Sequence, residues 1–133
     1  MDIKALFKIS YGLYVVSANE NGKDNGCIIN TFSQVTDTPL RVSVTVNKLN
    51  LTHDMIKSSG KFTVSVLSTS VPFGVFQNFG FRSGKDADKF EGIRTRRCEN
   101  GVLRLDENVN AFVSGKVAEE VDLGTHTMFI ADV

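Results

Sequence analysis

Hydrophobic and polar residues alternate along much of the chain, and this period of two predicts β-strands. The clearest case is the segment 40–47, LRVSVTVN, in which every second residue is Leu40, Val42, Val44 or Val46. We expect this face of the strand to be buried and the other to meet solvent. Strands are also expected in segments that alternate or are rich in β-branched residues: LYVVSA, CIINTFSQV, FTVSVL, VLRL, NVNAFVSGKVAEEV and HTMFIADV.

Short helices are expected between these strands. Apolar residues recur at helical spacing within residues 3–7, which predicts a short amphipathic helix at the start of the chain. A second helix is expected to begin at a capping residue, Asn50 or Thr52, and to end at Gly60 in the left-handed conformation. A third short helix is expected over residues 73–78.

The turns and the chain length complete the expected fold class. Asn21-Gly22 and Asn25-Gly26 tolerate positive φ and predict a hairpin turn between the first two strands. Many short strands with only small helices favour a mainly β fold, an antiparallel barrel or sandwich. With 133 residues, 41% of them hydrophobic, and no internal repeat or linker, the chain is expected to form one domain, residues 1–133, with one core.

Charge and composition exclude several classes of function. Fifteen basic and fifteen acidic residues cancel, so no net field would attract nucleic acid or an anionic membrane. The chain has neither the roughly 18 consecutive apolar residues of a transmembrane helix nor a signal-peptide core, so we expect a cytoplasmic protein. Cys27 and Cys98 lack CxxC spacing and a histidine-rich neighbourhood, so no metal site is expected and both thiols are interpreted as buried or incidental.

The segment from Phe79 to Phe90, FGFRSGKDADKF, is the strongest candidate for a ligand site. Between its aromatic residues it carries small and basic residues: Arg82, Ser83, Gly84, Lys85 and Lys89. Positive charge and small donors suit a phosphate, and the glycine allows backbone N–H groups to approach it closely. The alternative is a surface loop whose charges pair locally, but its phenylalanines must then cover core, ligand or a partner subunit.

Two further polar segments are candidates for the same site. Residues 26–36, GCIINTFSQVT, carry amides and hydroxyls that match the donors and acceptors of a flavin or nucleobase edge: Asn30, Thr31, Ser33, Gln34 and Thr36. In residues 47–54, NKLNLTHD, Lys48 and the Thr52 hydroxyl lie beside a predicted helix N-terminus, whose unpaired N–H groups favour a phosphate. Alone, residues 26–36 are more typical of a solvent-facing strand end, and residues 47–54 are equally compatible with a plain capped helix and a solvated lysine.

The histidines carry weaker signals. His126, at the start of the last predicted strand, could hydrogen-bond a cofactor edge or bind a reductant. A lone histidine in such a place is more often structural or exposed, and the same holds for His53. The sequence shows no serine, histidine and aspartate triad, no catalytic carboxylate pair, no P-loop and no GxGxxG fingerprint. No residue is therefore assigned as a nucleophile.

Four motifs in order, GCIINTFSQVT, NKLNLTHDMIKSSGKFTVSVLS, FGFRSGKDADKF and GTHTMFIADV, resemble the flavin reductase-like family of FMN-binding split barrels. The resemblance covers nearly the whole chain and is closest to the branch of flavoredoxin and the flavin domain of high-molecular-weight rubredoxin. It implies a six-stranded antiparallel Greek-key split β-barrel with short helices, which forms a homodimer with FMN at or near the subunit interface. Relatives usually continue past the strand ending at Val133, so the flavin domain of residues 1–133 is expected to lack their C-terminal segment.

The resemblance also implies roles for individual residues. The flavin ring or ribityl chain would lie against Asn30, Thr31, Ser33 and Gln34. The ribityl and phosphate end would lie against Asn47, Lys48, Asn50 and Thr52. The phosphate would be enclosed by Arg82, Ser83, Lys85 and Lys89. His126 lies where members of the family often place a histidine near the flavin.

The function that the resemblance implies is an oxidoreductase in which bound FMN takes a hydride from NADH or NADPH. The electrons would pass to free flavin or to a redox protein such as rubredoxin. The alternative is an FMN electron-transfer module that works between protein partners with little NAD(P)H activity. No feature of the sequence supports a split barrel that has lost its cofactor, because the basic and amide residues expected at the site are all present.

Overall fold

In the computed structural model, which describes residues 2–133, most of the chain is β-strand. The strands are β1 (Tyr14–Glu20), β2 (Lys23–Ile29), β3 (Ser33–Asp37), β4 (Leu40–Asn47), β5 (Lys61–Leu67), β6 (Thr95–Arg97), β7 (Leu103–Leu105), β8 (Val109–Asp122) and β9 (His126–Asp132). The helices are η1 (Ile3–Lys8), α1 (Leu51–Ser59) and α2 (Phe73–Gly80). None of these helices is long and apolar enough to cross a membrane.

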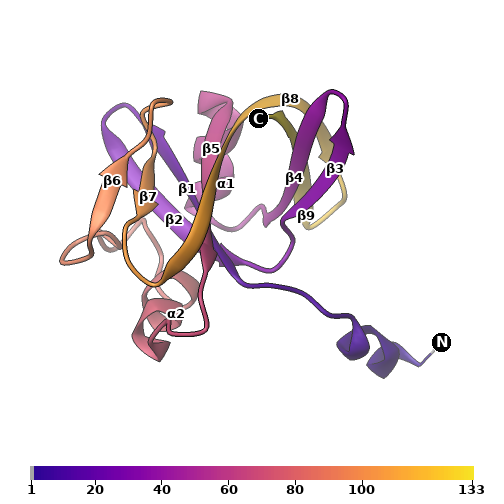
Figure 1. The fold of residues 1–133 in the computed structure, drawn as a ribbon, viewed down its shortest axis with the longest axis horizontal. Helices are drawn as coiled ribbons and strands as arrows, with labels where there is room; N and C mark the ends of the chain where they lie inside the picture. The colour runs from indigo at the N-terminus through magenta and orange to yellow at the C-terminus, as the bar shows by residue number, and fades with distance from the viewer. Residues whose placement is uncertain (1) are drawn as a thin grey trace.

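Seven strands form one antiparallel sheet in the order β2-β1-β5-β8-β9-β4-β3. The sheet curls, and β8 arches over the molecule from β5 towards β9 and β4 (Figure 1). The first half of β8 pairs with β5 and its second half with β9, so one long strand belongs to both sides of the barrel. The expected mainly β, antiparallel split-barrel class is confirmed, although the sheet has seven strands instead of six and a separate β6–β7 hairpin.

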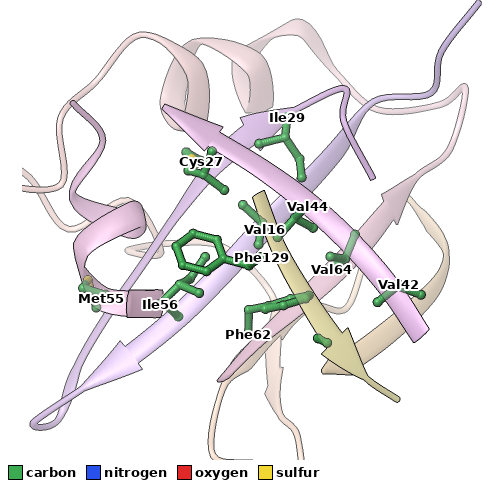
Figure 2. Close-up of a cluster of buried hydrophobic side chains, with 13 residues drawn as sticks. Val16, Cys27, Ile29, Val42, Val44, Met55, Ile56, Phe62, Val64 and Phe129 are labelled. Carbon is green, nitrogen blue, oxygen red and sulfur yellow. The ribbon is translucent and has the colours of Figure 1, made fainter. Parts of the chain in front are cut away.

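Apolar side chains from strands all around the barrel fill its interior (Figure 2). Phe62 and Phe129 are fully buried at its centre, and Ile56 of α1 packs against the same cluster. Complete burial of a side chain of this size stabilises the fold by about 1.5–3 kcal/mol. The alternation expected in β4 holds at Val42, Val44 and Val46, which are buried; Leu40 is exposed and the polar Ser43 is buried.

A second apolar cluster lies on the other face of β1. Val15 and Val16 are adjacent and both fully buried, because Val16 faces the barrel interior and Val15 faces this second cluster. The cluster consists of Val15, Phe79, Phe90 and Leu105, with the two phenylalanine rings in edge contact at 5.3 Å between centroids. It therefore anchors both ends of the 79–90 loop to the barrel.

Some local predictions were wrong, each for a tertiary reason. The turn lies at Asn21-Gly22 alone, and Asn25-Gly26 lies inside β2, where Gly26 lets the Phe90 ring pack closely against the strand. The predicted strand CIINTFSQV is interrupted after Ile29 and continues as β3, which pairs with β4 instead of β1. The N-terminal helix is a 3₁₀ helix with no buried residue.

Candidate functional site

Two pockets meet at the N-terminus of α1. The first, of about 270 Å³, lies between the end of β2, the end of β4 and the start of β9. Its walls include Tyr11, Leu13, Asn30, Thr31, Asn47 and His126. The second, of about 220 Å³, lies between the start of α1 and the 79–90 loop. Asn50 lines both pockets, so the two are neighbours at the N-terminus of α1, and we refer to them together as the bent groove.

The first pocket combines apolar walls with amide groups. Asn47 Oδ1 accepts a hydrogen bond from the Leu49 N–H at 2.9 Å, which leaves its amide N–H groups for a ligand. His126 Nδ1 lies 2.8 Å from the Thr125 hydroxyl, which fixes the imidazole ring at the pocket wall. Such walls suit a flat heterocycle that has both apolar surface and polar edges.

Thr31 has a different role in this wall. Its hydroxyl donates to the Thr45 carbonyl at 2.6 Å and accepts from the Thr45 N–H at 3.2 Å. These bonds join the end of β2 to β4 across a gap that no strand pairing bridges, since β2 and β4 are the first and sixth strands of the sheet. Thr31 thus holds the two strand ends at the edge of the pocket together. Its hydroxyl already makes hydrogen bonds to the Thr45 backbone.

The second pocket is lined by groups that favour an anion. Leu51 and Thr52 are in the first turn of α1, where backbone N–H groups have no intrahelical partner and the helix dipole is positive. The facing wall carries Arg82, Ser83 and Lys89. Arg82 donates to the Asn78 side chain at 2.6 Å, so its guanidinium keeps further N–H donors for a ligand.

Lys89 is the most unusual residue of this pocket. Its side chain is 4% exposed, and its ammonium donates to the carbonyls of Gly26 at 2.9 Å and Phe79 at 3.3 Å. Within residues 2–133 no carboxylate forms a salt bridge with it, and burial lowers the pKa of its ammonium. A buried cation without a counter-charge is costly, so the pocket favours an anionic ligand beside it.

Several contacts from β2 and α2 hold the 79–90 loop over this pocket. Lys23 donates to the Gly84 carbonyl at 3.0 Å, and the Asn78 amide donates to the Lys89 carbonyl. Gly84 packs directly on Asn25 of β2, because a Cβ there would lie 2.1 Å from Asn25 Oδ1. The position of the loop therefore depends on its contacts with Lys23 and the buried Asn25 of β2.

Comparison with known proteins agrees with this geometry. The family model described as "Flavin reductase like domain" matches residues 6–133. The chain belongs to the flavin reductase-like family.

The flavin reductase-like chain is 41% identical over 132 residues to the "Ferric-chelate reductase (NAD(P)H)" of Archaeoglobus fulgidus, covering 99% of this chain and 78% of the relative. It is 40% identical over 133 residues to the "High molecular weight rubredoxin" of Moorella thermoacetica, covering all of this chain and 58% of that protein. The chain thus spans little more than half of the rubredoxin relative. A Streptomyces globisporus NADH:FAD oxidoreductase has the same fold, with a TM-score of 0.87 at 22% identity over 98% of this chain and 78% of that one. The predicted family and its rubredoxin branch are confirmed.

The groove of this flavin reductase-like chain brings together eight of the predicted ligand residues and His126. The eight are Asn30, Thr31, Asn47, Asn50, Thr52, Arg82, Ser83 and Lys89. Segments far apart in sequence meet here because the ends of β2 and β4, the start of α1 and the 79–90 loop share one edge of the barrel.

Four other predicted residues lie outside both pockets. Ser33 and Gln34 are exposed on the edge strand β3, and their side chains bond to nearby backbone carbonyls. Lys48 donates to Asp122 at 2.7 Å and thereby lowers the pKa of that carboxyl. Lys85 lines a separate pocket of about 730 Å³ on the far side of the loop, with Lys23 and Asp24.

Sequence reasoning missed Tyr11 and Leu13, which line the first pocket from the segment between η1 and β1. Both side chains are exposed, 62% and 38% respectively. A large apolar residue placed between a helix and a strand gives no periodic signal, so only the folded chain reveals its place at the groove.

Proposed function

We propose that this chain is an NAD(P)H-dependent oxidoreductase domain that binds FMN in the bent groove. The ring would occupy the pocket that His126 lines, the ribityl chain would pass Asn50, and the phosphate would lie between the start of α1 and Lys89. The observation that carries the proposal is Lys89, a buried ammonium with no salt-bridge partner among residues 2–133, which lines a pocket together with the N-terminus of α1. A phosphate would satisfy both at once.

The residues present fit FMN in size and in chemistry. The two pockets, of about 270 and 220 Å³, share Asn50 as a lining residue, an arrangement that suits a ligand with a flat head and a charged tail. The name of the Archaeoglobus relative, a reductase that uses NAD(P)H, supports a nicotinamide donor. When bound, FMN would supply the two-electron chemistry by accepting a hydride.

The chain itself would bind and orient the reactants. Amide groups such as Asn47 Nδ2 would hydrogen-bond the polar edge of the ring, and in a two-electron couple about 1.4 kcal/mol of differential binding shifts the potential by about 30 mV. His126, held by Thr125, would border the ring and fix the approach of a second flat molecule. No side chain needs to act as a nucleophile.

Visible absorption spectroscopy tests the proposal. We expect the purified chain to bind added FMN and to show flavin bands that bleach when NADH or NADPH is added without oxygen. Bands that persist until a reduced redox protein is supplied would favour the electron-transfer alternative. The name of the Moorella relative suggests rubredoxin as the redox protein to use. A chain that binds no flavin would contradict the proposal.

The electron acceptor is proposed to be free flavin or a redox protein such as rubredoxin. The names of the relatives point to two acceptors, a ferric chelate and a rubredoxin domain. Nicotinamide oxidation should therefore be measured with free FMN, ferric citrate and rubredoxin in parallel. A rate that increases only with rubredoxin would assign the chain to the rubredoxin branch in function as well as in sequence.

The chain is also proposed to form a homodimer through its N-terminal arm, residues 2–13. The arm projects away from the barrel, and no residue of η1 is buried (Figure 1). It exposes large apolar side chains along its whole length: Ile3, Leu6, Phe7, Ile9, Tyr11 and Leu13. Tyr11 and Leu13, at the end of the arm, line the first pocket, which is proposed to hold the ring. A second copy that covers the arm would therefore also lie beside the groove.

Sedimentation measurements test the dimer. We expect wild-type chain to sediment at twice the 14.6 kDa chain mass and the double variant Leu6→Glu/Phe7→Glu to sediment as a monomer, because charges at these positions cannot be buried. Lys8→Glu on the same helix is the control and should stay dimeric. A monomeric wild type, or a double variant that remains dimeric, would rule out the arm as the interface.

A further inference from the structure

Asn50 is the residue before α1, and its side chain departs from the usual behaviour of asparagine at this position. An N-cap asparagine normally accepts a hydrogen bond from an N–H of the first helical turn through Oδ1. Asn50 has the extended backbone of an N-cap, with φ −79° and ψ 136°, but its side chain makes no capping bond. The expected cap contributes about 1 kcal/mol, so its absence needs a physical reason.

The Asn50 amide is instead turned towards Cys27 of β2. Asn50 Nδ2 donates to Cys27 Sγ at 3.7 Å, a distance typical of hydrogen bonds to sulfur. Cys27 is 3% exposed and belongs to the barrel core. The amide is planar, so a hydrogen bond that holds its nitrogen at Cys27 also fixes the direction of its oxygen, and Asn50 lines the groove.

The surroundings of Cys27 keep this sulfur available as an acceptor. Burial raises the pKa of the Cys27 thiol to about 11, against opposing effects of a Thr52 hydrogen bond and the Lys89 charge, so the thiol is neutral at pH 7. Thr52 is itself held by Asn25 Nδ2, which donates to its hydroxyl at 2.9 Å. A buried polar layer of Asn25, Thr52 and Cys27 thus lies directly behind Asn50.

Asn50 lines both the first pocket, proposed for the ring, and the second pocket, proposed for the phosphate, so its amide could contact the middle of an elongated ligand. We propose that Cys27 is a positioning residue, which holds the Asn50 amide with Oδ1 facing the groove as an acceptor for a hydroxyl of the flavin ribityl chain. This inference rests on the proposed flavin function and assigns to a core cysteine a part in ligand recognition.

The role predicts which substitutions preserve recognition. Cys27→Ser keeps an acceptor for Asn50 Nδ2, whereas Cys27→Val has a similar size and offers none. Without the acceptor the Asn50 amide is free to turn towards α1 and cap it. A neutral hydrogen bond to the ribityl chain would then be lost, which corresponds to about a threefold to tenfold weaker affinity.

The experiment compares FMN with lumiflavin, which has the same ring but no ribityl chain. Dissociation constants are measured by flavin fluorescence for wild type, Cys27→Ser and Cys27→Val, with folding checked by circular dichroism. We expect Cys27→Val to bind FMN about threefold to tenfold more weakly and lumiflavin as wild type does, and Cys27→Ser to keep wild-type affinity for both. If the valine variant does not fold, Cys27→Ala removes the acceptor in its place.

Other outcomes overturn the inference. Unchanged FMN affinity in Cys27→Val would mean that the thiol does not orient Asn50. An equal loss for FMN and lumiflavin would mean that Cys27 acts on the fold alone. In an Asn50→Ala background, Cys27→Val should have no further effect, and an additive loss would contradict action through Asn50. A wild type that binds neither flavin would instead refute the proposed function, which is distinguishable from these results.

Discussion

Replacing Lys89 with methionine is expected to weaken FMN binding about tenfold to a hundredfold while the affinity for riboflavin changes little. Methionine keeps the apolar stem of the side chain but removes the buried ammonium of a residue that lines the proposed phosphate pocket. A hydrogen bond to a charged group contributes about 1.5–3 kcal/mol to binding. Riboflavin has no phosphate and therefore does not make this bond in either protein. Titration of both ligands, followed by flavin fluorescence, measures the difference.

Lys85→Met is the matched control for this variant. Lys85 belongs to the same loop and carries the same charge, but it is exposed and lines the pocket on the far side of the loop. Its replacement should change FMN affinity by less than about threefold, as expected for a distant exposed charge. If Lys85→Met weakens FMN binding more than Lys89→Met, the phosphate lies on the other side of the loop.

The Lys89 ammonium should also make FMN binding sensitive to alkaline pH. Burial lowers its pKa, so the charged form that attracts the phosphate is lost at a lower pH than for an exposed lysine. Affinity for FMN should therefore be full at neutral pH and fall as pH rises through this lowered pKa. The fall should be absent in Lys89→Met, and an identical pH profile in both proteins would exclude Lys89 as its source.

Replacing Gly84 with alanine is expected to displace the 79–90 loop and to weaken FMN binding at least about tenfold. The new Cβ would lie 2.1 Å from Asn25 Oδ1 and 2.5 Å from its Nδ2. Asn25 is 1% exposed and bonded to Thr52, so it cannot move aside and the loop must move instead. Overpacking of this kind costs about 1–3 kcal/mol, and it would move Ser83 away from the proposed phosphate site.

Gly74→Ala is the control for Gly84→Ala. Gly74 lies in α2, and nothing lies within 4 Å of an added Cβ. Alanine there should leave FMN affinity unchanged and should raise the thermal midpoint slightly, because it favours the helix by up to about 1 kcal/mol. Thermal unfolding without flavin and FMN titration measure both effects. Wild-type affinity in Gly84→Ala would show that the loop position does not govern binding.

Local sequence patterns predicted most helices and strands, because hydrophobic periodicity and the residues that start or end a helix act over only a few residues. The Gly60 prediction shows this best: it ends α1 with φ 73°, where an L-residue with a side chain would be strained. The three residues of β6 were missed because so short a strand, Thr95–Arg97, has no period to detect and exists only by pairing with β7.

Individual site residues were harder to predict than the motifs that contain them. The 79–90 loop was predicted from its sequence as a ligand-binding segment, yet the two lysines within it have opposite environments. Lys89 is buried beside the groove and Lys85 is exposed behind the loop. Both are lysines of one polar loop, so only the packing of Phe79 and Phe90 on the barrel distinguishes them.

Residue types and their order were sufficient to predict the family, the strand-rich class and the segments that line the groove. These depend on residue types in order, and short-range physics acts on them before any tertiary contact forms. The tertiary structure decided which side of each segment meets the ligand. It turned Asn50 away from its helix towards Cys27, held Lys48 at Asp122, and buried Lys89 where no carboxylate of the described residues forms a salt bridge with it. These outcomes depend on distances between residues far apart in the chain.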